Sequence, residues 1–264
     1  MKIEANGISI HYMLDGAESA PVVTLSHSLA TDLTMWEPQM DALLTSYRVL
    51  RYDTRGHGKT SVPRGPYSFD MLAGDVAALL KSLGIEKTLF MGISMGGMIG
   101  QALALKSQDL LSGLILCDTM SRIPDEAKSI WDERIDSVQK DGMESQVEST
   151  IQRWLRPPYR EKNPEVVGKV EAMIRTTKPE GYIGCAQAIR ELNLTEQISG
   201  ITIPTLIIVG EDDPATPVFA SQEIKDKIKN SELVILGSAA HLSNIEQSEA
   251  FNRAVLNFLR KGKP

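Results

Sequence analysis

The sequence carries a G-x-S-x-G motif at residues 92–96, placed between an apolar run and a helix-forming run. The run before it, residues 87–93, is typical of a short buried strand, and residues 95–105 favour a helix. A serine in a tight turn between a strand and a helix has a strained backbone that exposes its hydroxyl. Both glycines are needed, because a Cβ atom at either position would collide with the neighbouring chain. The motif and its context predict that Ser94 is a nucleophile rather than an ordinary serine in a glycine-rich connection.

The rest of the chain alternates between apolar strand-like runs and helix-like runs. Such alternation is typical of a mostly parallel sheet covered by helices on both faces, with ligands bound beyond the carboxyl ends of the strands. We therefore predict an α/β fold with about eight strands, in which Asn6-Gly7 makes a hairpin turn. A capping-box pattern, Ser243 followed by Glu246, is expected to start the last helix. The predicted strands are residues 2–4, 8–14, 21–26, 47–53, 87–93, 111–118, 205–209 and 233–236, and the predicted helices are residues 34–44, 69–83, 95–105, 219–229 and 243–260.

Residues 122–194 interrupt this alternation. The segment has no convincing strand pattern, is rich in charged residues, and is broken by Pro157, Pro158, Pro164 and Pro179. We interpret it as a helical cap inserted into a core domain that consists of residues 1–121 and 195–264.

A nucleophilic serine needs a base, and the base needs an acid that orients it. In a strand–turn–helix hydrolase the chain order is Ser, acid, His. His241 is the one histidine after Ser94, and it lies between the last predicted strand and the last predicted helix. His27 and His57 precede the serine, so both are weaker candidates for the base than His241. His27 is better explained as part of the oxyanion loop. His241 is therefore the predicted base.

Three aspartates could orient that base. Asp212 and Asp213 both follow the predicted strand at residues 205–209. We prefer Asp213, because Asp212 is better explained as a turn or helix-entry residue. Asp118, at the end of the strand at residues 111–118, is a third candidate, although an aspartate that anchors a loop is the simpler interpretation.

Composition and charge restrict the class of function. Hydrophobic residues make up 42% of the chain and charged residues 23%, which is ordinary for a globular protein, and 264 residues suffice for a large core. The net charge of −6 argues against a nucleic-acid partner, and no apolar run is long enough to span a membrane. The start does not resemble a signal peptide and the two cysteines make no disulfide framework, so we expect a cytoplasmic protein. No phosphate loop or metal cluster is visible, so no cofactor is expected.

Nearly the whole chain resembles the α/β-hydrolases, and among them the 3-oxoadipate enol-lactonases. The matching stretches are SHSLATDLTMWEPQ, YDTRGHGKTSVPRGPY, GISMGGMIGQ, RWLRPPYREKNPE, IPTLIIVGEDDPATP and AAHLSNIEQ. The resemblance implies that the backbone N–H groups of Leu29 and Met95 bind the oxyanion. It also implies that the stretch centred on Trp154 belongs to the cap, and we expect Trp154 to line the pocket.

The same resemblance bears on the acid and on the oxyanion loop. The family pattern of a glycine, an aspartate three residues later and a proline four residues further on falls on Gly210, Asp213 and Pro217, which favours Asp213. The loop at residues 27–30 reads His-Ser-Leu-Ala, whereas the enol-lactonases tend to have Asn first and Gly last.

Together with the motif, the resemblance implies a cofactor-independent serine hydrolase that cleaves small carboxylic esters or lactones through an acyl-enzyme. Enol-lactonase substrates carry a free carboxylate, which needs a cation in the pocket. An apolar pocket would instead indicate a carboxylesterase or an N-acyl-homoserine lactonase. A non-catalytic ligand receptor on the same scaffold ranks lower, because Ser, Asp and His are all present. The cap offers Arg134, Arg153, Arg156, Arg175 and Arg190 as candidate cations.

Overall fold

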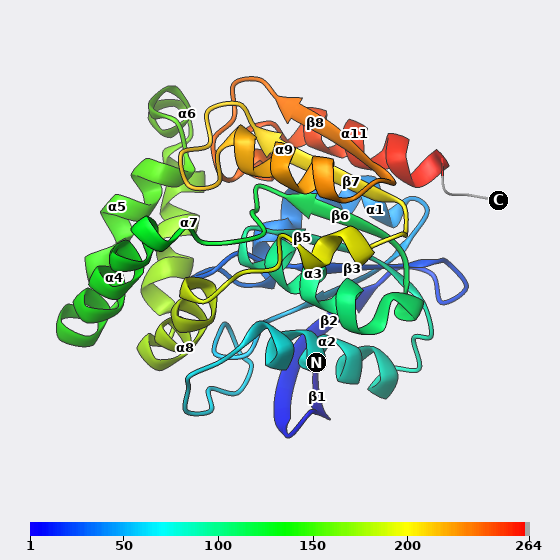
Figure 1. The fold of residues 1–264 in the computed structure, drawn as a ribbon, viewed down its shortest axis with the longest axis horizontal. Coiled ribbons are helices and arrows are strands. Elements are labelled where there is room, and N and C mark those ends of the chain that lie inside the picture. Colours follow the sequence, from blue (N-terminus) through cyan, green and yellow to red (C-terminus); the bar gives the residue numbers. More distant parts are fainter. Residues whose placement is uncertain (262–264) are drawn as a thin grey trace.

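The computed structural model describes residues 1–261. Within them the chain forms an eight-stranded sheet in the order β1-β2-β4-β3-β5-β6-β7-β8 (Figure 1). The strands are β1 (Lys2–Ala5), β2 (Ile8–Asp15), β3 (Val22–Ser26), β4 (Arg48–Tyr52), β5 (Thr88–Ile93), β6 (Leu111–Cys117), β7 (Thr205–Gly210) and β8 (Ser231–Leu236). β2 pairs antiparallel with β1 and β4, whereas the other neighbours are parallel. The predicted α/β fold with a mostly parallel sheet is confirmed.

The β1–β2 hairpin turns at Asn6 and Gly7, as predicted. Their φ angles of 49° and 74° lie in the left-handed region that a two-residue Asn-Gly turn requires. The Asn6 side chain donates a hydrogen bond of 2.7 Å to Asp75 in α2 (Phe69–Ser82). This bond ties the first hairpin to a helix that covers the sheet.

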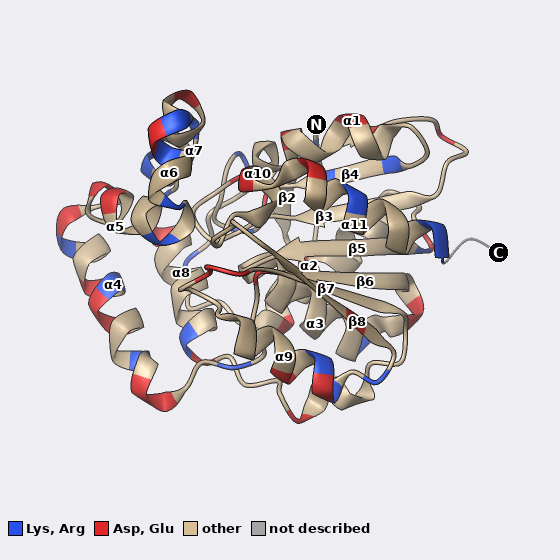
Figure 2. Cartoon of the chain, turned by 90° about the horizontal axis from the view of Figure 1, so that it is seen from above, with Lys and Arg blue, Asp and Glu red and all other residues tan. Residues whose placement is uncertain are grey.

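Helices cover both faces of the sheet (Figures 1 and 2). One face is covered by α2, α3 (Met95–Ser107) and α9 (Val218–Lys227), and the other by α1 (Glu37–Leu44) and α11 (Ser248–Lys261). The central strands β5, β6 and β7 are almost wholly buried. Burial on both sides explains why their sequences are continuous apolar runs rather than alternating ones.

The chain between β6 and β7 is helical and lies at the carboxyl ends of the strands (Figure 1). It forms α4 (Lys128–Asp141), α5 (Glu144–Trp154), α6 (Pro157–Lys162), α7 (Pro164–Thr176) and α8 (Pro179–Arg190). The helices α6, α7 and α8 each begin with a proline. Proline suits the first position of a helix, because the backbone N–H that it lacks would have no acceptor within the helix. Short 3₁₀ helices are η1 (Leu33–Trp36), η2 (Gln108–Leu110), η3 (Asp125–Ala127) and η4 (Gln197–Gly200).

Two predicted helices differ from the structure. The helix predicted over residues 34–44 begins as the 3₁₀ turn η1, and α1 starts beside Pro38, which cannot donate to a preceding turn. The helix predicted over residues 243–260 is two helices, α10 (Ser243–Glu246) and α11, separated by Gln247 with a non-helical ψ of 47°.

The capping box predicted at Ser243 and Glu246 is wrong. The Ser243 hydroxyl donates to Asp118, 2.5 Å away, and not to its own helix. The Glu246 carboxylate accepts from the backbone N–H groups of Arg156 and Ala240. Both side chains are buried, so their hydrogen bonds go to tertiary partners that the local sequence does not reveal.

The outer helices carry most of the charge. Figure 2 shows Lys and Arg interspersed with Asp and Glu along α4, α7 and α9, while the strands are mostly uncharged. No helix within residues 1–261 is both long and apolar enough to cross a bilayer.

Candidate active site

Ser94 lies in the turn between β5 and α3, at the carboxyl end of the sheet. Its φ of 54° and ψ of −116° are strained for a residue with a side chain. Its N–H donates to the Cys117 carbonyl at 2.9 Å, and its carbonyl accepts from the Thr119 hydroxyl at 2.8 Å. These bonds to the end of β6 hold the turn in its strained form.

The two motif glycines are needed for the reason predicted. A Cβ atom on Gly92 would overlap the carbonyl of Gly96, and one on Gly96 would overlap the carbonyl of Ser26. The strand, the turn and the first turn of α3 can therefore pack together only without these side chains. This packing brings the N-terminus of α3, with its free N–H groups and positive dipole end, next to Ser94.

His241 lies in the loop between β8 and α10, and its Nδ1 is 2.8 Å from Oδ2 of Asp213. Asp213, in the loop after β7, also accepts from the Thr216 hydroxyl at 2.6 Å and from the N–H groups of Ala215 and Thr216 at 2.8 and 3.0 Å. Burial alone would raise the pKa of Asp213, but His241 and these donors together lower it. The carboxylate is therefore ionised near neutral pH and holds the imidazole by Nδ1, which leaves Nε2 for the cavity that Ser94 also lines.

The other two candidate aspartates have different partners. Asp212 is half exposed, and its Oδ2 lies 3.4 Å from Nη1 of Arg156. Asp118 is fully buried after β6, and it accepts from Gly210 and Ser243. Of the three, only Asp213 is bonded to His241 in the described part of the chain.

The peptide between Ser28 and Leu29 is held in one orientation. The Ser28 carbonyl oxygen accepts from Nδ1 of His27 at 2.7 Å and from the Thr31 hydroxyl at 2.8 Å. The C=O and N–H of a trans peptide point in opposite directions, so the Leu29 N–H faces away from these anchors. Over residues 1–261, neither this N–H nor that of Met95 has a protein acceptor. Two backbone donors thus remain free beside the serine.

Two buried histidines hold the same loop from behind. Nε2 of His27 accepts from the Thr54 N–H at 2.9 Å, and Nε2 of His57 accepts from the Ala30 N–H at 3.0 Å. Burial lowers the pKa of both rings, that of His57 to about 3, so both are neutral near pH 7. Ala30 has a φ of 59°, at a position where the family pattern has glycine. Sequence reasoning missed this role of His57, because its partner lies 27 residues away.

Ser94 and His241 line a cavity of about 250 Å³ beneath the helices α4, α5 and α8. Leu29 and Trp154 also line it. Part of the lining is apolar, and part is cationic. The apolar part includes Met98, Met120, Ile123, Ala127, Trp131 and Ile189.

Arg134 in α4 and Arg153 in α5 supply the cationic part, and neither pairs with a carboxylate among the described residues. The Arg134 guanidinium lies 4.7 Å from the centroid of the Trp131 ring, and Nη2 of Arg153 donates to the Thr150 hydroxyl at 3.0 Å. Burial lowers the pKa of both guanidinium groups, and the charge of Arg134 lowers that of Arg153 further, to about 10. The other three candidate cations face acidic partners instead: Arg156 pairs with Asp212 and Glu246, Arg175 with Glu144 and Glu171, and Arg190 with Asp132 and Glu191.

Trp154 ends α5 and contacts the loop that carries the base. Its ring centroid is 5.9 Å from that of His241, and its carbonyl accepts from the Leu242 N–H at 3.1 Å. Two residues later, the Arg156 N–H donates to the buried Glu246 carboxylate at 2.9 Å. The end of α5 and the residues after it are therefore fixed to the loop that carries His241 at Leu242 and to α10 at Glu246.

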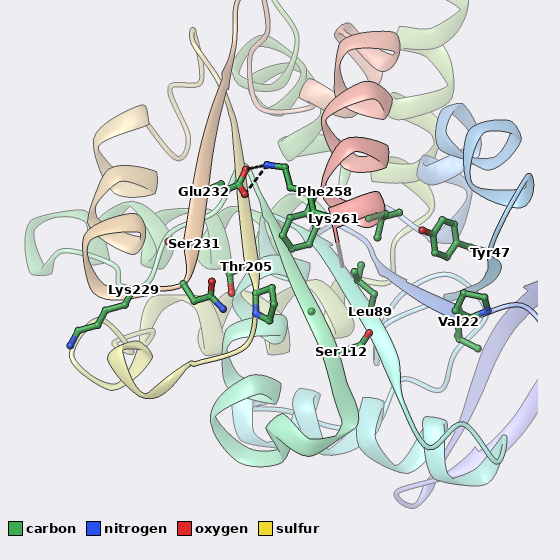
Figure 3. A pocket seen from close by; sticks show the side chains of 15 residues that line it. Val22, Tyr47, Leu89, Ser112, Thr205, Lys229, Ser231, Glu232, Phe258 and Lys261 are labelled. Carbon is green, nitrogen blue, oxygen red and sulfur yellow. Dashed lines mark hydrogen bonds and ion pairs between the residues drawn. The ribbon is translucent and has the colours of Figure 1, made fainter. Parts of the chain in front are cut away.

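A larger cavity, of about 550 Å³, lies at the other end of the strands (Figure 3). Its walls include the first residues of several strands, among them Val22, Thr205 and Ser231, and a pair between Lys261 and Glu232 at 2.7 Å. No histidine of residues 1–261 lines it, so its hydroxyls have no imidazole base. Within the same residues, no group of three or more His, Cys, Asp or Glu side chains is arranged to hold a metal ion. The smaller cavity is therefore the candidate active site.

Comparison with known proteins agrees with the fold. The profile of a family described as alpha/beta hydrolase fold matches residues 21–248. The 3-oxoadipate enol-lactonase 2 of Acinetobacter baylyi is 38% identical over 253 residues, which is 96% of this chain and 94% of that protein.

Two solved structures are similar over nearly their whole length. The enol-lactonase of Burkholderia xenovorans has a TM-score of 0.96 and 38% identity, over 98% of this chain and 100% of that one. A thermophilic esterase of Thermogutta terrifontis, solved with malate bound, has a TM-score of 0.94 and 31% identity, over 100% of both chains. With its strained serine turn, its buried Asp–His pair and these relatives, the chain belongs to the α/β-hydrolase family.

Proposed function

We propose that this chain is a serine hydrolase of small carboxylic esters and lactones, and that its preferred substrates carry a free carboxylate. The observation that carries the proposal is the lining of a single cavity. Ser94 and His241 lie in that cavity together with two arginines, Arg134 and Arg153, that have no acidic partner among residues 1–261. A nucleophile, a base and an uncompensated positive charge are thus offered to the same small molecule.

The proposed reaction uses five residues. Ser94 attacks the acyl carbon while Nε2 of His241 takes its proton, and Asp213 holds the ring by Nδ1 and stabilises the imidazolium. The backbone N–H groups of Leu29 and Met95 bind the oxyanion of the tetrahedral intermediate. His241 then protonates the leaving oxygen, which in a lactone stays attached to the acyl group. Water activated by the same imidazole releases the acid and restores the serine.

The two arginines account for substrate preference. Each carries a positive charge that burial makes costly, which is why the pKa values of both guanidinium groups are lowered. A bound carboxylate would compensate both charges, and a guanidinium can bind it through two parallel hydrogen bonds. The cavity of about 250 Å³ is below the usual range of roughly 300–1,000 Å³ for drug-sized ligands, which favours a small substrate. The enol-lactonase relatives and the malate-bound esterase support the same chemistry.

A second candidate rests on the apolar part of the lining. Met98, Met120 and Ile123 can receive a short acyl chain, as a carboxylesterase or an N-acyl-homoserine lactonase would need. A non-catalytic ligand receptor is a third reading of the same scaffold. If the wild type hydrolyses a simple p-nitrophenyl ester and Ser94→Ala does not, the hypothesis of a non-catalytic receptor is wrong.

The helices between β6 and β7 are proposed to act as the cap. Residues 122–194 would cover a core domain of residues 1–121 and 195–264, exclude water and shape the substrate. The cavity supports this division, because α4, α5 and α8 line it from one side and the strand-end loops from the other. The cytoplasm is the proposed compartment, because two cysteines that form no disulfide fit a reducing environment.

The carboxylate preference can be tested by inhibition and by substitution. We expect a small dicarboxylate such as adipate to inhibit the wild type competitively against a carboxylated ester. Arg134→Gln and Arg153→Gln should lower kcat/KM for that ester by about 10- to 100-fold, since a hydrogen bond to a charged group contributes about 1.5–3 kcal/mol. Both variants should leave a neutral ester of the same alcohol almost unaffected and should weaken inhibition by adipate.

Arg175→Gln is the matched control. It removes an arginine of the same helical segment that pairs with Glu144 outside the cavity, so neither substrate should respond. If adipate fails to inhibit while neutral acyl analogues inhibit strongly, the carboxylate preference is wrong and the carboxylesterase or acyl-lactonase reading stands.

Trp154 should set substrate shape, because it lines the cavity beside His241. Trp154→Ala enlarges the cavity, and we expect the ratio of kcat/KM between a bulky and a small ester to change by about 10-fold or more. Parallel kinetics with the two esters and a thermal melt provide the measurement. A large drop in Tm with an unchanged ratio would mean that the ring serves only the core.

A further inference from the structure

Asp118 is a buried carboxyl group that the proposed reaction does not use. It follows β6 in the left-handed region, with a φ of 43°, and its side chain has no exposure to solvent. A non-glycine residue in this conformation persists only where its surroundings fix it. Burying an ionised carboxylate without partners would also cost much free energy, so the side chain needs hydrogen-bond partners.

One carboxyl group here contacts the end of β7, which leads into the acid loop (residues 211–217), and the start of α10, which follows the histidine loop (residues 237–242). Oδ1 accepts from the N–H of Gly210 at 2.8 Å, and Oδ2 is 2.5 Å from the hydroxyl oxygen of Ser243. Gly210 ends β7 three residues before Asp213, and Ser243 lies two residues after His241. Asp118 is thus a bridge between the acid loop and the histidine loop.

The two loops are packed directly against each other at this bridge. A Cβ atom on Gly210 would meet the Ala239 carbonyl oxygen at 2.5 Å, and the Asp212 N–H donates to the same oxygen at 2.9 Å. A small shift of either loop would change the Asp213–His241 distance of 2.8 Å. Misplacement of a catalytic group by about 1 Å can cost about 10²-fold in rate.

The charges around Asp118 favour its neutral form. Asp213 and Glu246 are the acidic groups that face it, the Cys117 thiol adjoins it, and Arg156 neutralises Glu246 rather than Asp118. Burial, and then the negative charge of Asp213, raise the pKa of Asp118 well above its usual range, against the opposing effect of its two hydrogen bonds. A carboxylic acid kept neutral by an apolar site can act as a hydrogen-bond donor.

We propose that Asp118 is a positioning residue for the reaction. As a neutral carboxylic acid it accepts from Gly210 at Oδ1, and its 2.5 Å contact with Ser243 at Oδ2 is reversed, so that the Ser243 hydroxyl oxygen becomes the acceptor. These two contacts keep Asp213 and His241 in register. It adds no second negative charge beside the imidazole. This role rests on the proposed function of Asp213 and His241 as acid and base.

Two substitutions separate the bonds from the charge. Asp118→Asn keeps both bonds, because the amide oxygen can accept from Gly210 and the amide N–H can donate to Ser243. We expect kcat close to wild type and an unchanged acid limb of the pH–rate profile. Asp118→Ala removes both bonds, and kcat should fall by about 10²-fold with little change in KM. Asp212→Asn is the control, since it removes a charge from the same loop without touching either bond.

Several outcomes would overturn the proposal. An acid limb that moves to lower pH in Asp118→Asn would mean that Asp118 is ionised and stabilises the imidazolium by charge. An Asp118→Ala enzyme as active as wild type would remove the positioning role. If Asp118→Ala fails to fold, the charge state can still be decided with Asp118→Asn. The His241 imidazole is titrated by NMR in Ser94→Ala and in Ser94→Ala/Asp118→Asn. Any difference between these two titration curves contradicts a neutral Asp118. Turnover that survives Ser94→Ala would instead refute the proposed function, independently of Asp118.

Discussion

Ser94→Ala is expected to reduce kcat by on the order of 10⁴- to 10⁶-fold, with folding and ligand binding intact. The hydroxyl is the atom that attacks the acyl carbon, and among the hydroxyl-bearing residues within 1–261 that line the cavity only Ser94 has a φ in the left-handed region, as an exposed nucleophile in this turn does. The measurement is single-turnover and steady-state hydrolysis of a p-nitrophenyl ester, with adipate binding followed by calorimetry. Residual catalysis should come only from the oxyanion donors and from binding.

Two controls are available for Ser94→Ala. Alanine keeps the small Cβ atom, so the turn between Gly92 and Gly96 should retain its packing, and the melting temperature should change little. Ser28→Ala is a matched control, because that hydroxyl is also buried beside the cavity but has no place in the proposed chemistry. Turnover near the wild-type level in Ser94→Ala would place the nucleophile elsewhere.

Local sequence was most informative where one chemical requirement fixes several neighbouring residues. The G-x-S-x-G motif is such a case: the two glycines, the strand before them and the helix after them are all needed to hold one strained serine. The continuous apolar runs of β5, β6 and β7 likewise predicted buried parallel strands, because only burial on both faces removes the need for alternation. The fold could therefore be predicted nearly in full.

The sequence failed where a side chain is bonded by a distant partner. Ser243 and Glu246 have the spacing of a capping box, yet Asp118 and the Ala240 N–H take their hydrogen bonds. A helix cap is a local preference of about 1 kcal/mol, which a buried tertiary bond outweighs. The support that the His57 ring gives to the oxyanion loop is hidden for the same reason, since its partner Ala30 lies in another part of the chain.

The five cap arginines illustrate a different limit. Four of them lie on helices and Arg156 precedes Pro157, but nothing in the local sequence shows which of the five faces a cavity. The structure separates them by what they face: Arg175 and Arg190 meet carboxylates at the surface, whereas Arg134 and Arg153 turn into the cavity without one among the described residues. Which face of a helix is covered depends on how the helices pack on the core, and that is a property of the whole fold.

The acid of the triad gives the second large effect. Asp213→Asn should lower kcat by on the order of 10⁴-fold with little change in KM. The carboxylate accepts four hydrogen bonds, from Nδ1 of His241, from the Thr216 hydroxyl and from the N–H groups of Ala215 and Thr216. An amide in its place can present its NH₂ group to Nδ1, which favours the tautomer with the proton on Nε2, and that ring cannot accept the serine proton.

Asp212→Asn, one residue earlier, is the control: it leaves the Asp213 carboxylate bonded to the imidazole, so its kcat should stay close to wild type. Steady-state kinetics of the two variants on one ester would decide between them, and a greater loss in Asp212→Asn would show that the base is oriented by another group.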